Sequence, residues 1–331
     1  MSHSSIDFNR WDGPRHGVWA RRAVITSTGL RQLLRMRVFK ILLFVGWAAA
    51  LAVAAAGFVF AQTMAEGGWL ANLATSAGPR PAAMMKALSA MLLVFPDILV
   101  TGGFKGIFWV HSQVGLLLSL AAMTLLVPQL ITRDRASQAL TIYLARPLTS
   151  RDYLLGKLGI IAGVLLLLWT GPLLAGWGLS MLLVPDSIFL SHSLPALGAA
   201  LLFNLIAMVV VGAIAFGVSA LGRTAATARL GWIGLWIVLS IVANAGPRLP
   251  GWVRHASFSY DLRMVRDEVF AMNETLTDAA AVVPMLNREL ARELNDAATQ
   301  VGTDEIGGVV TGLCVLVGGS MLVLLGRVKP E

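Results

Sequence analysis

Few residues of this 331-residue chain belong to motifs that are typical of catalytic or metal-binding sites. The sequence has no GxxxxGK[ST] loop to hold phosphates, no HExxH or CxxC metal motif and no GxSxG nucleophile turn. Cys314 is the only cysteine. The histidines are scattered without the spacing of metal ligands: His3, His16, His111, His192 and His255. These patterns argue against an enzyme, and we expect this chain to bind no metal or cofactor of its own.

Amide side chains are the main polar groups inside the long apolar runs, namely Gln113, Asn204 and Asn244. No Asp or Glu lies in the central part of such a run, whereas an ion-coupled carrier needs ionisable groups at membrane depth. We therefore expect the energy for any transport to come from elsewhere. The three amides could line a path or bridge two helices, and the sequence leaves both roles open.

The most ordered polar stretch lies between two apolar runs and reads LITRDRASQALTIYLARPLTSRDYLLGKL, residues 130–158. The first run ends at a charged cluster, Arg133, Asp134 and Arg135. The segment ASQALTIYLA then predicts a short helix with Leu140 and Tyr143 on one side.

A rigid turn and a capped helix are expected to follow in the same loop. Pro147 ends the short helix, and Arg146, as the residue before a proline, is biased away from helical geometry. Thr149 predicts a cap for the next helix, with Asp152 three residues later near its N-terminus. That helix continues through Arg151 and Lys157 into the next apolar run.

These residues must be positioned by membrane-spanning helices. The chain is 56% hydrophobic and 13% charged, against about 25% charged in soluble domains, and its mean hydropathy is +0.74. Lipid leaves backbone groups without partners unless the segment is helical. We predict an all-α integral membrane protein forming a single membrane domain, residues 1–331, with six spans at about 38–62, 107–131, 158–184, 194–221, 230–245 and 306–326.

The lysines and arginines predict the orientation of these spans. They gather in the N-terminal segment, the loop between spans two and three, the loop between spans four and five, and the C-terminal tail. By the positive-inside rule, this side is the cytoplasm of a bacterial-type inner membrane, with both termini inside. The net charge of +8 is thus interpreted as contact with anionic lipid and not with nucleic acid.

Three further segments are expected outside the spans. ITSTGLRQLLRMRVFK predicts a basic amphipathic helix on the inner membrane surface, although it could also be the first turns of span one. Residues 82–100 are expected to form an external, re-entrant or interfacial helix, because a seventh crossing would turn the basic loops outward. Residues 247–305 predict an extracytoplasmic helical insertion in which Pro284 separates two helices.

The loop resembles the signature region of type-two ATP-binding-cassette (ABC) permeases. The resemblance rests on the acidic-basic pair Asp134-Arg135, the ALTIYLA helix, the turn from Arg146 to Arg151, and the entry Leu154-Leu155-Gly156-Lys157. Aspartate replaces the usual glutamate, and Ser150 is an extra residue. The resemblance is specific over about thirty residues, and the insertion 247–305 has no match in it.

The resemblance implies a permease subunit of an ABC transporter that has no catalysis of its own and works as an exporter. Residues 132–157 would dock on a separate ATPase subunit, which holds ATP and Mg. The coupling residues would be Arg133, Asp134, Arg135, Leu140, Tyr143, Arg146, Pro147, Thr149, Arg151 and Lys157. Two permease chains, identical or different, would pair in the bilayer. The alternative function is a non-transporting membrane scaffold that recruits a partner through its external helices.

Overall fold

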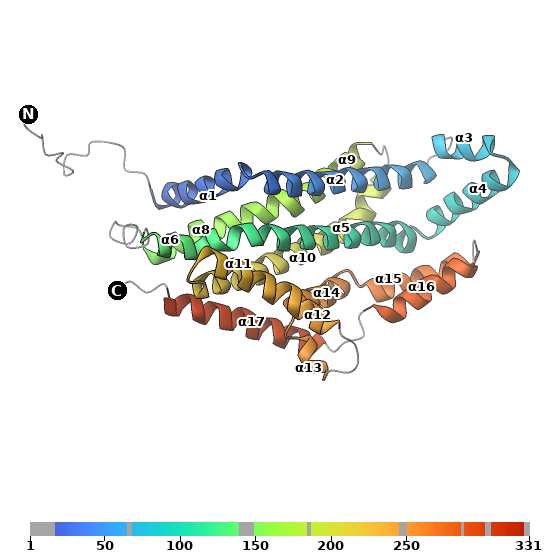
Figure 1. Cartoon of the computed structure of the whole chain (residues 1–331). Helices are drawn as coiled ribbons and strands as arrows, with labels where there is room; N and C mark the ends of the chain where they lie inside the picture. The colour runs from blue at the N-terminus through green and yellow to red at the C-terminus, as the bar shows by residue number, and fades with distance from the viewer. Residues whose placement is uncertain are drawn as a thin grey trace, which may run out of the picture.

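The long apolar runs form long helices, and Figure 1 shows them side by side in a computed structural model. The structure describes residues 17–64, 68–138, 149–183, 187–244, 250–285, 288–301 and 306–327. Within these residues the chain is helical and contains no β-strand. The predicted all-α fold class is confirmed.

The first half of the described chain contains nine helical segments. They are α1 (Val18–Leu34), α2 (Arg37–Met64), α3 (Trp69–Ser76), α4 (Pro79–Val94), α5 (Pro96–Val127), the π-helical turn η1 (Pro128–Thr132), α6 (Arg133–Ala136), α8 (Ser150–Leu165) and the π-helical turn η2 (Leu166–Thr170).

The second half of the described chain begins with the end of the third apolar run. It contains α9 (Gly171–Leu182), α10 (Ser187–Leu221), α11 (Ala225–Ile233), the π-helical turn η3 (Gly234–Val238), α12 (Leu239–Ala243), α13 (Gly251–Arg254), α14 (Phe258–Val269), α15 (Met272–Val282), the short 3-10 helix η4 (Val283–Met285), α16 (Arg288–Gln300) and α17 (Ile306–Arg327).

Six helices of the described chain are long and apolar enough to cross a membrane, as the sequence predicts. They run Arg37–Thr63, Pro96–Ala136, Ser150–Leu182, Phe189–Leu221, Ala225–Ala243 and Ile306–Arg327. The second is much longer than expected, since its 41 residues extend about 60 Å at 1.5 Å per residue. This is about twice the thickness of the hydrocarbon layer, so this helix projects beyond it.

The helix expected at residues 82–100 has different bounds in the structure. α4 ends at Val94, Phe95 leaves helical geometry, and α5 begins at Pro96. The prediction of one separate helix is therefore wrong, because residues 96–100 belong to the second candidate span. Proline is favoured in the first turn of a helix, where its missing N–H has no partner to lose. Pro96 thus starts α5 where a single continuous helix was expected.

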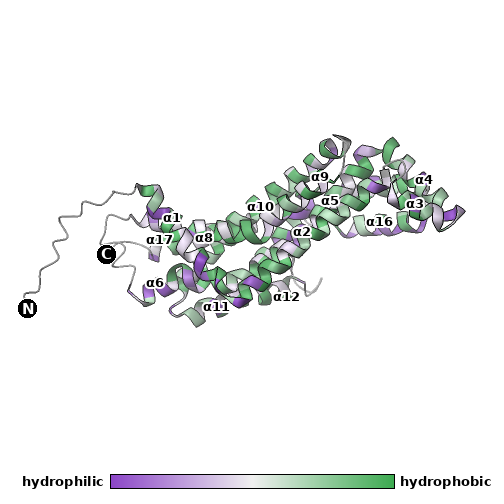
Figure 2. Ribbon diagram, turned by 90° about the horizontal axis from the view of Figure 1, so that it is seen from above, coloured by the Kyte–Doolittle hydropathy of each residue, from purple (hydrophilic) through white to green (hydrophobic). Residues whose placement is uncertain are grey.

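Both described ends of the chain lie at one end of the bundle. Figure 1 places α1, α6 and the last turns of α17 together there, and α3, α4 and the α15–α16 pair at the opposite end. Figure 2 shows hydrophilic ribbon near α1 and α6, and apolar ribbon along α2, α5 and α10. Six crossings return the chain to the side on which it started. Which side faces the cytoplasm stays a prediction.

Residues 250–301 supply the helices of the predicted insertion. Pro284 lies in η4, between α15 and α16, so the predicted division into two helices is confirmed. α14 packs against α5, α10 and α17, whereas α15 packs on α5 and α16. The insertion is therefore attached to the spans along α14 and α15, and its placement outside the membrane stays a prediction.

The core of the bundle is formed by α5 and α10, which are the most buried of the six spans. Edge-to-face contacts join Phe60 of α2, Phe104 of α5 and Phe189 of α10, with ring centroids 5.8–6.0 Å apart. At Gly176 of α9, a Cβ atom would lie 2.6 Å from the carbonyl oxygen of Ala50 in α2. α2 and α9 therefore approach closely only because this position has no side chain.

The close contact between α2 and α9 at Gly176 can be tested by substitution. Gly176→Ala should destabilise the protein by about 1–3 kcal/mol, because the added methyl group meets fixed backbone. Gly178→Ala on the same helix is the matched control, since a Cβ there meets nothing within 4 Å. Thermal unfolding of both variants in detergent measures the effect. Equal melting temperatures would contradict this α2–α9 contact.

Candidate functional site

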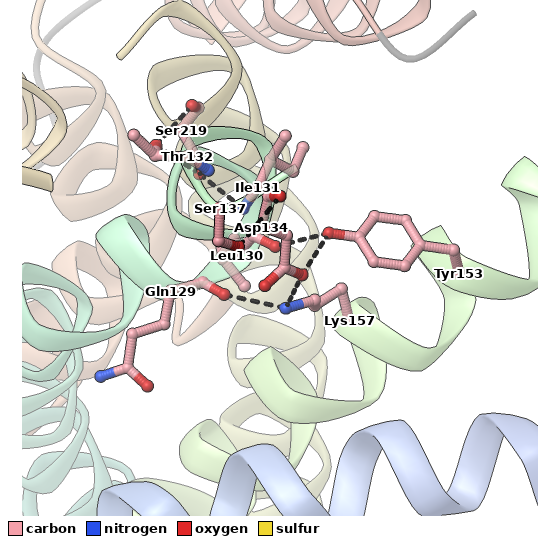
Figure 3. Close-up of polar contacts among 9 residues, drawn as sticks. All are labelled: Gln129, Leu130, Ile131, Thr132, Asp134, Ser137, Tyr153, Lys157 and Ser219. Carbon is pink, nitrogen blue, oxygen red and sulfur yellow. Dashed lines mark hydrogen bonds and ion pairs between the residues drawn. The ribbon is translucent and has the colours of Figure 1, made fainter. Parts of the chain in front are cut away.

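The end of α5 is reshaped by Pro128, which lacks a backbone N–H and disfavours a regular helical turn. The chain passes through the π-helical turn η1 before α6. Two N–H groups of this region, those of Ile131 and Thr132, donate to Ser219 Oγ of α10 at 2.9 and 3.3 Å. The Thr132 hydroxyl donates to the Ser219 carbonyl oxygen at 2.7 Å (Figure 3). The turn is thereby attached to α10.

The carboxylate of Asp134 is the centre of the polar contacts at this end (Figure 3). Lys157 Nζ of α8 lies 2.7 Å from Asp134 Oδ2 and donates to the Gln129 carbonyl oxygen at 2.9 Å. The Tyr153 hydroxyl lies 2.7 Å from the same Oδ2 and 2.9 Å from the Leu130 carbonyl oxygen. Tyr153 and Lys157 are buried. These contacts hold the start of α8 against the end of α5.

Arg135 attaches α6 to the end of α10. Its guanidinium donates to the carbonyl oxygen of Ala220 at 3.0 Å and also to that of Gly222. The last carbonyl groups of a helix have no partner within it, and a cation there also opposes the negative end of the helix dipole. One side chain therefore caps α10 and fixes α6.

The start of α8 carries the cap that the sequence predicts. The Asp152 backbone N–H donates to Thr149 Oγ1 at 3.2 Å, and this hydroxyl donates to Asp152 Oδ2 at 2.7 Å. Arg22 Nε of α1 donates to Asp152 Oδ1 at 2.9 Å. The cap is thus confirmed, and its carboxylate also binds the N-terminal helix.

α1 lies along α8 in the same direction, on a face of small residues. A Cβ at Gly156, Gly159 or Gly163 of α8 would lie within 3.0 Å of a side chain of α1. The Thr26 hydroxyl donates to the Gly156 carbonyl oxygen at 2.9 Å. These glycines therefore allow α8 and α1 to approach each other closely. Its position on a membrane surface stays a prediction.

A cavity of about 290 Å³ lies between α1, α5, α6 and α8. Asp134 and Lys157 line it together with Gln32 of α1. Arg133 also lines it and is exposed, as is Arg151 at the start of α8. Two exposed arginines thus flank the loop, while Asp134 and Lys157 behind them are held in place by their contacts.

The structure brings together only part of the predicted coupling set. Asp134 and Lys157 form the ion pair, Arg135 and Thr149 cap helices, and Arg133 and Arg151 are exposed. The remaining four predicted residues lie outside the described residues: Leu140, Tyr143, Arg146 and Pro147. Their coupling role stays a prediction.

Sequence reasoning did not assign a role to Arg22, Gln129, Tyr153 or Ser219. Each acts through a partner on another helix, so no local spacing identifies it. The one available signal was Tyr153, an aromatic residue with a polar tip one turn before Lys157 in the capped helix. A tyrosine buried there needs a hydrogen-bond partner, and the charged cluster before the loop supplies one.

The three intramembrane amides lie apart from this site and contact neighbouring elements. Gln113 Oε1 accepts from Arg266 of α14, and Asn204 Nδ2 donates to Thr170 Oγ1 at 3.1 Å. Asn244 Oδ1 accepts from Arg263 at 3.0 Å. A role in lining a path stays a prediction. Among the described residues, no group of three His, Cys, Asp or Glu could hold a metal ion.

The fold is that of a multi-pass helical membrane protein, and the described ends of its basic loop contact α1, α8 and α10. Residues 115–247 match the model of a family described as ABC-2 family transporter protein. The resemblance found in the loop is thereby confirmed, since this part of the chain matches a family of ABC transporter permeases. The matched residues contain the whole loop and end before α13–α16. No curated protein matches the chain.

The ion pair at the centre of the site generates a stability test. Lys157→Met should destabilise the protein by about 1–3 kcal/mol, because it leaves the Asp134 carboxylate without its cation. The Asp134→Asn and Lys157→Met double variant should lose less than the sum of the single losses. Thermal unfolding in detergent measures all three variants.

Arg151→Met is the matched control for this test, since Arg151 is an exposed cation on the same helix. We expect its melting temperature to stay near that of the unchanged chain. Additive losses in the double variant would show that Asp134 and Lys157 do not stabilise each other.

Proposed function

We propose that this permease is a subunit of an ATP-driven exporter, moved by a separate ATPase that docks on residues 132–157. The chain has no phosphate-binding loop of its own, so ATP and Mg would be held by the ATPase. Two permease chains would pair in a bacterial-type inner membrane, with the loop and both termini in the cytoplasm. The concentration of basic residues in the connections on that side supports this orientation.

The observation that carries the proposal is the anchoring of both ends of the loop. On the side of α5, Asp134 binds Tyr153 and Lys157 of α8. On the side of α8, Thr149 caps the helix and Asp152 binds Arg22. A displacement of the loop must therefore move α5 and α8 together, because breaking these contacts would leave buried charges unpaired.

The same anchoring extends the movement to a third span and to the N-terminal helix. Arg135 and Thr132 attach the end of α5 to α10, and α1 lies on the glycine face of α8. We infer that ATP binding, by drawing two ATPase subunits together, shifts this whole end as one body. The spans would then reorient without any ionisable group moving through the membrane.

The exposed arginines on either side of the loop provide the test. Arg133→Glu combined with Arg151→Glu should lower the amount of ATPase that copurifies with the tagged chain by roughly tenfold. Repulsion from an acidic docking surface has this magnitude when two charges are reversed. The measurement is a pull-down in mild detergent, with identification of the captured proteins and a vanadate-sensitive ATP hydrolysis assay.

Arg80→Glu combined with Lys86→Glu on α4 is the matched control, because these cations are also exposed but lie at the opposite end of the bundle. This variant should retain the ATPase. Capture of an ATPase equally by both double variants would contradict docking at the loop. A chain that brings down a non-ATPase partner, lost only in the α4 variant, would instead support the scaffold function.

A further inference from the structure

A basic cavity of about 510 Å³ lies far from the loop, between α5, α12, α14 and the end of α16. Three arginines and one carboxylate line it, which leaves a net charge of +2 (three minus one). They are Arg254, Arg263, Arg266 and Asp267. Trp109 and Tyr260 add aromatic walls. A positively charged cavity with aromatic walls favours an anionic group.

Arg266 is a fixed part of the cavity wall. Its guanidinium is buried, pairs with Asp267 at 2.9 Å and lies 4.1 Å from the centroid of the Trp109 ring. Trp109 Nε1 donates to Asp267 Oδ1 at 2.6 Å. Burial lowers the pKa of Arg266 from its usual range, Asp267 opposes this effect, and the like charge of Arg263 adds to it.

Arg263 is the cation that remains for a ligand. Its Nη2 donates to Asn244 Oδ1 at 3.0 Å, and its guanidinium carbon lies 5.8 Å from the centroid of the Tyr260 ring. Among the described residues, no carboxylate forms an ion pair with Arg263. A guanidinium has five N–H donors, so most of those of Arg263 are left for an incoming anion.

An apolar groove continues from the basic cavity along α12. Trp236, Ile237, Ser240 and Ile241 line this groove, and Asn244 lines both the groove and the basic cavity. Ile237 and Ile241 are 42% and 65% exposed. The fifth candidate span ends at Ala243, so the groove lies along the membrane-spanning segment and the basic cavity lies at its end.

We propose that the groove and the cavity form one composite site that binds an amphiphile carrying a phosphate headgroup. The phosphate accepts hydrogen bonds from Arg263 within the cavity, and the acyl chain lies over Ile237 and Ile241 in the groove. The order of the two parts matches a lipid, with its headgroup at the membrane border and its chain in the hydrocarbon layer. The site goes beyond the proposed function, since it requires no ATPase for binding.

Binding to the purified full-length chain tests the proposal. Dioctanoyl phosphatidylglycerol and dioctanoyl phosphatidylcholine are titrated in a neutral detergent, and bound lipid is counted by native mass spectrometry. Phosphatidylglycerol should bind about tenfold more tightly, because phosphatidylcholine carries a cation beside its phosphate. Arg263→Gln should remove this preference. Ile241→Ser should instead weaken the binding of both lipids and leave the preference for phosphatidylglycerol unchanged.

The matched control is Arg292→Gln, an exposed arginine of α16 that does not line the cavity. It should leave both affinities unchanged. Equal affinities for the two lipids in the unchanged chain, or a preference that survives Arg263→Gln, would overturn the proposal. Full displacement of phosphatidylglycerol by equimolar inorganic phosphate, with no effect of Ile241→Ser, would show a site for a free anion instead.

A second copy of the chain is the other possible occupant of the groove. Ile241→Cys is therefore combined with Cys314→Ser, which removes the exposed native cysteine, and oxidised in membranes. The proposal expects a monomer on a non-reducing gel. Efficient formation of a disulfide-linked dimer would mean that α12 is covered by the partner copy, and it would overturn the lipid site.

Discussion

One half-buried carboxylate, that of Asp134, determines how this end of the protein is organised. A carboxylate inside a membrane protein is costly unless a cation and hydrogen-bond donors surround it. Lys157 and Tyr153 meet this requirement, and both come from α8. The chain must therefore return along α5 after the loop, in a register that places two turns of α8 beside η1 and α6. The positions of the loop and of α10 follow from this register.

The glycines on one face of α8 determine where α1 packs. Gly156, Gly159 and Gly163 leave a shallow surface, and α1 occupies it with Ile25, Thr26 and Leu30. Helices associate in membranes mainly through close packing and hydrogen bonds, and this contact uses both. The basic N-terminal helix is thereby bound to protein on one side, while residues such as Arg31 remain exposed on the other.

Local patterns were sufficient for the features that depend on neighbouring residues. The six apolar runs gave the spans, Pro284 gave a helix boundary, and the Thr149–Asp152 spacing gave a cap. Contacts between distant residues could not be predicted in this way, because Arg22 and Asp152 are 130 positions apart. The basic cavity was missed for the same reason. Arg263 lies in α14, but Asn244 and Trp109 line the cavity from two other elements.

The length of α5 links the two ends of the molecule. Trp109, in the first half of α5, contacts α14, and Arg133 begins α6 at the loop end of the molecule. Trp109 and Arg133 are 24 positions apart (133 − 109), which corresponds to about 36 Å of helix, and the π-helical turn η1 interrupts its regularity. In the proposed mechanism, a tilt of this helix imposed by the ATPase would be transmitted to the wall of the basic cavity. By thermodynamic reciprocity, a ligand in that cavity would then also bias the tilt and hence the opposite end.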